Sequence, residues 1–172
     1  KGTGLIQEML TLIDAYDSSE PYLEFQGRVV SDDLLSKSTE TRVVDIVRNI
    51  FKDRFLCYDI NIPKVLKEIR EEYVSMSVLT QIFFLYTCRA NKLLVDFIIE
   101  VYYKKVNSGS YGLKASDPKD FIKNTISDGR IVESWSESTI IRVSRHIIAT
   151  LIDFELIQKN KTIINFRIID LT

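Results

Sequence analysis

The chain has 172 residues and a mass of 19.9 kDa, with 45% hydrophobic and 27% charged residues. This composition is that of a folded globular protein and excludes an extensively disordered chain. The 23 basic and 24 acidic residues give a net charge of -1, which excludes a uniformly basic nucleic-acid coat but permits a local basic surface.

The first part of the chain shows the periodicity of helices. Apolar residues at helical spacing predict a helix over residues 4–16, and Ser31 is predicted to cap a short helix over residues 31–36. The capping residues 38–41 precede a predicted helix that ends near residue 55. The following predicted helices cover residues 63–73, with Pro63 in the first turn, and then residues 78–89 and 92–105.

Residues 106–117 differ in character from the helices before them. They contain the run Asn107-Ser108-Gly109-Ser110-Tyr111-Gly112 and have no apolar periodicity. Small and polar residues of this kind are typical of a loop between subdomains. We therefore expect a helical N-terminal subdomain over residues 1–112 and a C-terminal subdomain over residues 113–172.

The C-terminal part combines helices with a change of period. A helix is predicted over residues 118–127, and a second is predicted to run from Ser136 or Ser138 to residue 153. After Phe154 the apolar period changes from 3.6 to 2, which predicts strands over residues 156–159 and 162–169. The expected fold is mainly α: a helical bundle with helix-turn-helix character, followed by a winged helix-turn-helix with a small β-hairpin wing.

In a winged helix-turn-helix the second helix enters the DNA major groove, and residues near its N-terminus contact the bases. The hairpin tip is placed to contact phosphate. The first candidate DNA-binding surface is therefore formed by Ser136, Ser138, Thr139, Arg142, Arg145, Lys159 and Lys161. The alternative is a solvated helix face in which the arginines pair with Glu137 or Asp153.

A second candidate DNA-binding surface lies earlier in the chain. It comprises Lys37, Ser38, Thr39, Thr41, Arg42 and Arg48, within a segment (residues 37–54) whose net charge is +2. Hydroxyl groups at a helix N-terminus can bind a phosphate, but plain helix capping by the same residues is the alternative.

The near-zero net charge is unevenly distributed along the sequence. Residues 1–36 carry a net charge of -5, whereas residues 134–168 carry +2. A weak and local DNA contact is compatible with this pattern, with a slope of log K against log salt of roughly -4 to -5 if four to six phosphates are neutralised. The acidic N-terminal stretch favours the rival hypothesis, a scaffold that binds other proteins without DNA.

Cysteine and histidine, the residue types that most often bind metals or act in catalysis, are scarce in this sequence. The only cysteines are Cys57 and Cys88, the only histidine is His146, and the known motifs for phosphate-binding loops, dinucleotide binding and nucleophile elbows are missing. We expect no metal, no cofactor, no small-molecule substrate and no enzymatic activity. Two reduced thiols are typical of a cytoplasmic protein. No apolar stretch reaches the roughly 20 residues of a membrane-spanning helix.

Three stretches resemble the BrxA family of BREX (bacteriophage exclusion) phage-defence systems, and the resemblance covers residues 4–171. The most specific stretch begins at Trp135-Ser136-Glu137-Ser138-Thr139-Ile140 and continues through Arg142, Arg145, Leu151 and residues 153–157. Residues 34–42 and 93–97 agree with the same family. One departure is Glu155, because the family often has glycine at this position between the long helix and the wing.

The resemblance implies a helical protein with winged-helix character that binds double-stranded DNA. It also implies a non-enzymatic accessory role beside a methyltransferase, a phosphatase-like protein and an ATPase of the same defence system. The sequence itself does not indicate the preferred DNA sequence, the oligomeric state or the surface used by each protein partner.

Overall fold

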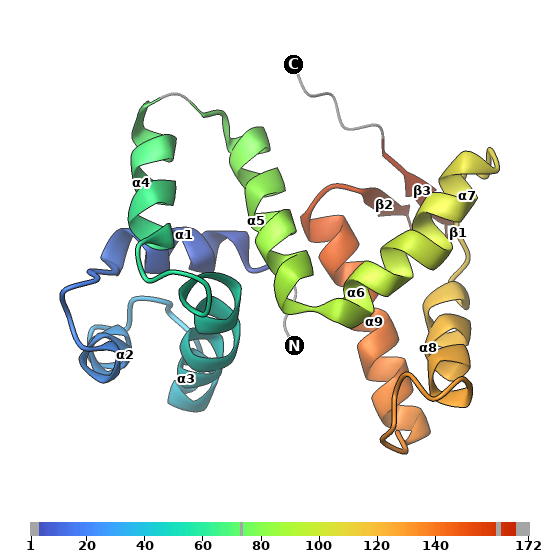
Figure 1. Ribbon diagram of the computed structural model, residues 1–172, viewed down its shortest axis with the longest axis horizontal. Helices are drawn as coiled ribbons and strands as arrows, with labels where there is room; N and C mark the ends of the chain where they lie inside the picture. The colour runs from blue at the N-terminus through green and yellow to red at the C-terminus, as the bar shows by residue number, and fades with distance from the viewer. Residues whose placement is uncertain (1–3, 73, 161–162, 168–172) are drawn as a thin grey trace. The chain divides into compact units, whose positions relative to one another are not determined.

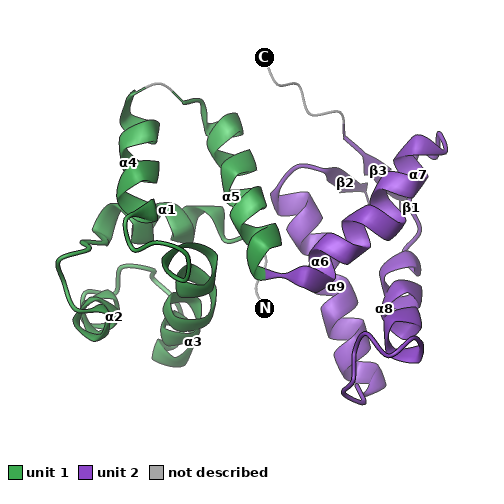
Figure 2. Ribbon diagram, in the orientation of Figure 1, with its two compact units in different colours: residues 1–90 green, residues 91–172 purple. Residues whose placement is uncertain are grey.

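A computed structural model describes residues 4–72, 74–160 and 163–167 of the chain (Figure 1). These residues are mainly helical and form a small antiparallel sheet, which confirms the predicted fold class. It divides into two compact units, residues 1–90 and residues 91–172 (Figure 2). This division lies before the subdomain boundary predicted at residue 112, because residues 91–112 pack within the second unit.

The first unit consists of helices. Their bounds are α1 (Ile6–Ala15), α2 (Tyr22–Ser31), α3 (Glu40–Ile46), α4 (Ile62–Glu72) and α5 (Met76–Ala90). Helix α3 continues directly into a π-helical segment, η1 (Val47–Leu56). As predicted, Thr39 caps α3, because its side chain accepts a hydrogen bond from the backbone N–H of Arg42.

Aromatic rings form the centre of this first unit. The rings of Phe25 and Phe51 lie 5.9 Å apart, those of Phe51 and Phe55 lie 5.5 Å apart, and those of Phe55 and Phe83 lie 5.7 Å apart. All four side chains are buried. Aromatic pairs at these separations add to the stabilisation that burial provides, so this cluster holds α2, η1 and α5 together.

The helix predicted over residues 31–36 is wrong. Ser31 is the last residue of α2 and not an N-cap. The residues that follow form turns, and Asp33 and Ser36 have positive φ angles of 47° and 46°. A right-handed helix cannot include residues in this left-handed region, so the local capping pattern misidentified the end of one helix as the start of another.

The second unit begins with one continuous helical rod and ends with a hairpin. The rod comprises α6 (Lys92–Phe97), the π-helical segment η2 (Ile98–Tyr102) and α7 (Tyr103–Asn107). Strand β1 (Gly112–Leu113) is followed by α8 (Asp117–Ser127), α9 (Glu137–Asp153), β2 (Ile157–Asn160) and β3 (Ile163–Phe166). The strand order is β1-β3-β2, and both pairings are antiparallel. This is the order of elements in a winged helix-turn-helix.

Contacts with the later elements place the rod in this unit. The ring of Phe97 lies 5.4 Å from that of Phe121 in α8, and the Tyr102 hydroxyl donates a hydrogen bond to the carbonyl of Leu156. Strand β1 pairs with β3 at Gly112, where an added Cβ would lie 1.8 Å from the carbonyl oxygen of Ile164. Only glycine permits this close approach of the two backbones.

Helix α9 starts and ends where the sequence predicts. Ser136 is its N-cap and accepts a hydrogen bond from the backbone N–H of Thr139. Two polar residues of this helix, Ser144 and Thr150, are buried. Each hydroxyl donates to the carbonyl four residues earlier, which satisfies it without a partner on another element.

Candidate nucleic-acid interface

One face of α9 carries the predicted DNA-binding side chains. At 3.6 residues per turn, Ser138, Arg142, Arg145 and Ala149 fall within an arc of about 60°. We call these four residues the recognition stripe. Ser138, Arg142 and Arg145 are exposed, and the opposite face of the helix carries the buried residues Ile147 and Leu151. The packing of α9 against its unit therefore turns the stripe toward solvent.

Both arginines of the stripe are available to a ligand. Among residues 4–72, 74–160 and 163–167, no carboxylate forms an ion pair with Arg142 or Arg145. Glu137, one of the two partners considered from sequence, instead pairs with lysines of α8. The guanidinium groups need not leave an internal partner before they bind a phosphate or a base.

The hydroxyl groups at the start of α9 are engaged with one another. Ser136 Oγ lies 2.9 Å from Ser138 Oγ and 3.0 Å from Thr139 Oγ1, in addition to accepting the N-cap hydrogen bond. Of these three residues, Ser136 and Ser138 are exposed, and Thr139 is half-buried. The structure thus assigns Ser136 a capping role, and a DNA contact through these hydroxyls stays a prediction.

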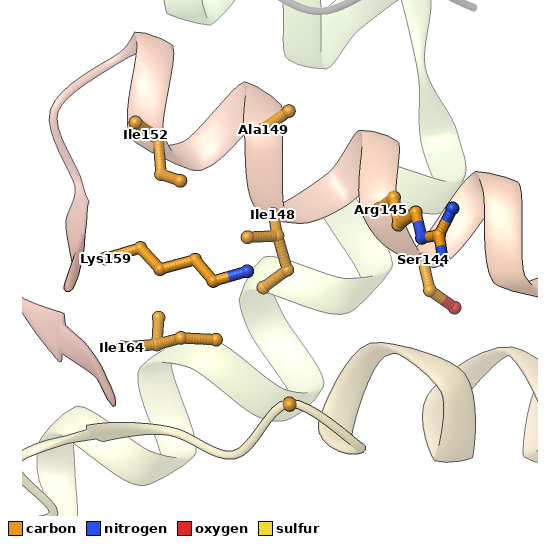
Figure 3. Close-up of a pocket in the computed structure, with 8 residues that line it drawn as sticks. Ser144, Arg145, Ile148, Ala149, Ile152, Lys159 and Ile164 are labelled. Atoms are coloured by element: carbon orange, nitrogen blue, oxygen red, sulfur yellow. The ribbon is translucent and has the colours of Figure 1, made fainter. Parts of the chain in front are cut away.

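Lys159 lies in β2 opposite Ile164 of β3, and Lys161 lies outside the described residues. Lys159 and Arg145 both line a pocket of about 370 Å³ between α9 and the hairpin. Figure 3 shows the Lys159 side chain extending across this pocket toward Ile148. Ile148 and Ile152 form an apolar wall beside the stripe. One cation of the wing therefore lies close to the recognition stripe.

In the second predicted surface, most of the cations form ion pairs within the protein. Lys37 Nζ lies 2.5 Å from a Glu8 carboxylate oxygen, and Arg42 lies 2.5 Å from Asp45. Burial raises the pKa of Glu8, but the hydrogen bond and the charge of Lys37 outweigh it and hold the pKa below its ordinary value. Two of the three predicted cations are thus paired with carboxylates of the same unit.

Four residues of the second surface, Thr39, Thr41, Arg42 and Arg48, line a shallow hollow. Ser38, Thr41 and Arg48 are exposed, and the hollow, of about 560 Å³, is lined by Thr39, Thr41, Arg42, Val44, Asp45, Arg48 and Asn49. The Asp45 carboxylate within this lining opposes an anion. The first surface therefore offers cations that are more accessible to phosphate than those of the second.

Two lysines of α8, Lys119 and Lys123, were not predicted from sequence to belong to the interface. Lys119 Nζ lies 2.5 Å and Lys123 Nζ 3.7 Å from the Glu137 carboxylate at the start of α9. Their spacing of four residues, which puts them on one helix face, was the available signal. Their position beside Glu137 could not be predicted from sequence, because it depends on how α8 packs against α9.

The described residues contain no group of three or more His, Cys, Asp or Glu side chains arranged to hold a metal ion. Cys57 and Cys88 are both free thiols, and burial raises the pKa of Cys88 to about 11. Within the same described ranges, none of the helices combines the length and apolar character needed to cross a membrane.

Comparison with protein families matches residues 1–170 to the BrxA family. Comparison with curated proteins gives no match. The family match covers nearly the whole chain, including α3, the recognition stripe and the hairpin strands. The chain therefore belongs to the BrxA family and is a component of a BREX phage-defence system.

Proposed function

We propose that this protein is a cytoplasmic, non-enzymatic accessory component of its defence system that binds double-stranded DNA through the recognition stripe. Other proteins of the same system are its expected partners. The observation that carries the proposal is the pair of exposed guanidinium groups of Arg142 and Arg145, on the second helix of a helix-turn-helix. Helices in this position enter the major groove, and arginine binds phosphate and guanine with paired hydrogen bonds.

The shape of α9 favours close approach to a groove. Ala149 continues the stripe of Ser138, Arg142 and Arg145 with a small side chain, which permits close approach to a groove at that position. Lys159 of β2 adds a cation from the wing. Three cations can neutralise only a few phosphates. We therefore expect the affinity for DNA to be modest, to fall with salt and to depend little on the DNA sequence.

Fluorescence anisotropy with a labelled duplex tests the proposal. The measurement compares the protein with the double variant Arg142→Ala/Arg145→Ala at several salt concentrations, after circular dichroism has shown both to be folded. The control variant Lys92→Ala/Lys104→Ala removes the same charge from exposed positions of α6 and α7. We expect the stripe variant to lose at least tenfold in affinity and the control variant to lose much less.

The scaffold hypothesis has one observation in its favour. Ile148 and Ile152 line an apolar wall next to the stripe, and apolar surface of this kind suits a protein partner better than phosphate. If the protein does not raise the anisotropy of the labelled duplex even at low salt, the scaffold hypothesis replaces DNA binding. If the stripe variant and the control variant bound the duplex with equal affinity, the proposal that the recognition stripe contacts DNA would be contradicted.

A further inference from the structure

Lys119 and Lys123 form a cationic pair at the junction of α8 and α9. Their ammonium groups lie 2.5 Å and 3.7 Å from opposite oxygens of the Glu137 carboxylate. One carboxylate therefore contacts two cations, and the three side chains together carry a net charge of +1. The hydrogen bond from Lys119 lowers the pKa of Glu137, so this carboxylate is charged at neutral pH.

The three side chains are accessible to a ligand. Their exposed fractions are 36% for Lys119, 49% for Lys123 and 53% for Glu137. Ion pairs this exposed contribute little to stability, because water and salt compete for each charge. A second anion can therefore displace the Glu137 carboxylate without a large loss of folding free energy.

The position of the pair relative to the recognition stripe suggests which anion would displace it. Glu137 directly precedes Ser138, the first residue of the stripe. In helix-turn-helix proteins the helix before the recognition helix crosses the DNA backbone. Helix α8 is that helix here, and it carries both lysines. A phosphate next to a groove-bound α9 would meet the lysines at the point where Glu137 now contacts them.

We propose that Lys119 and Lys123 form a DNA phosphate-binding site that the Glu137 carboxylate occupies in the free protein. Binding of a duplex exchanges one anion for another: a phosphate replaces the carboxylate, and Glu137 turns to solvent. Glu137 thereby acts as an internal competitor that weakens DNA binding. This inference rests on the proposed function, because it assumes that α9 meets the duplex through its stripe.

Removal of the Glu137 charge gives a defined expectation. A unit charge about 6 Å from a phosphate in water-like surroundings changes a binding constant about threefold, and the freed lysines add to that effect. The variant Glu137→Gln should therefore bind a duplex at least threefold more tightly than the unmodified protein. If the two lysines hold one phosphate, removing both should make the salt slope shallower by about 0.9.

The experiment is a salt series of anisotropy titrations with a labelled duplex. It compares the full chain with Glu137→Gln, with the charge-matched control Glu133→Gln, and with the triple variant Glu137→Gln/Lys119→Ala/Lys123→Ala. Glu133 is exposed and forms no ion pair with the described residues. We expect a gain for Glu137→Gln that exceeds the gain for Glu133→Gln and is lost in the triple variant.

Two outcomes would overturn the inference while leaving DNA binding intact. Equal gains for Glu137→Gln and Glu133→Gln would mean that only net charge matters. A gain that persists in the triple variant would mean that the lysines hold no phosphate. Absence of binding by the protein and by every variant at low salt would instead refute the proposed function itself. Circular dichroism of each variant separates these outcomes from a failure to fold.

Discussion

Glu155 has the least favourable backbone conformation at the junction of α9 and the wing. Its φ angle is 61°, in the left-handed region that favours glycine. The residue follows Phe154, the C-cap of α9, and its backbone N–H donates to the carbonyl of Ile152. Glycine would adopt the same conformation without steric conflict.

The variant Glu155→Gly should raise the free energy of unfolding by about 0.5–1 kcal/mol. A non-glycine residue in the left-handed region costs about 1–2 kcal/mol, whereas glycine restores about 0.5–1 kcal/mol of backbone entropy to the unfolded chain. The substitution also removes an ion pair in which Glu155 lies 3.5 Å from Arg167. Both side chains are largely exposed, so this pair contributes less than about 0.5 kcal/mol.

Urea denaturation followed by circular dichroism measures this difference. The matched control is Glu155→Ala, which removes the carboxylate but keeps the Cβ that causes the conflict. We expect Glu155→Gly to be more stable than both the unmodified protein and Glu155→Ala. If Glu155→Gly were no more stable than Glu155→Ala, the left-handed conformation at this position would not be destabilising for a residue with a Cβ.

Three further predictions follow from the packing and the pKa values. In the same assay, Gly112→Ala should destabilise the protein by more than about 1 kcal/mol, because the added Cβ would clash with β3. The variant Gly27→Ala in α2 should instead stabilise the protein by up to about 1 kcal/mol, because nothing lies within 4 Å of the added Cβ. Phe51→Ala should cost about 3–5 kcal/mol, since it removes the ring that contacts both Phe25 and Phe55. Burial raises the pKa of the Cys88 thiol from 9.0 to about 11. At pH 8 this thiol should therefore react with iodoacetamide about 100-fold more slowly in the folded than in the urea-unfolded protein, and its rate in the folded protein should rise about tenfold per pH unit up to pH 11. Equal rates in the folded and unfolded protein would contradict the burial of Cys88.

The elements with strong local signals were predictable from sequence. Helix α9 and the hairpin were identified because a period of 3.6 gives way to a period of 2 after Phe154. Strand β1 was missed because it has only two residues, and its partner in the sheet, β3, is about fifty residues later. Helix α2 was missed because its exposed residue Leu23 and its internal Gly27 obscure the stripe formed by Phe25 and Val29.

The candidate interface was predictable only in part. The positions of Arg142 and Arg145 on one face follow from helical geometry, but their freedom from ion pairs depends on where Glu137 points. The sequence left open an ion pair of Glu137 with one of these arginines, whereas the packing of α8 pairs Glu137 with Lys119. The ion pair of Lys37 with Glu8 likewise joins a loop to α1, far apart in the sequence, so no local pattern could indicate it.

The salt dependence of duplex binding tests DNA recognition by the stripe most directly. The measurement compares the slope of log K against log salt for the unmodified protein and for Arg142→Ala/Arg145→Ala. If both arginines neutralise a phosphate, the slope of the unmodified protein should be steeper by about 1.8, twice the value for one contact. Parallel slopes, or a protein that does not bind the duplex at low salt, would contradict DNA recognition through α9.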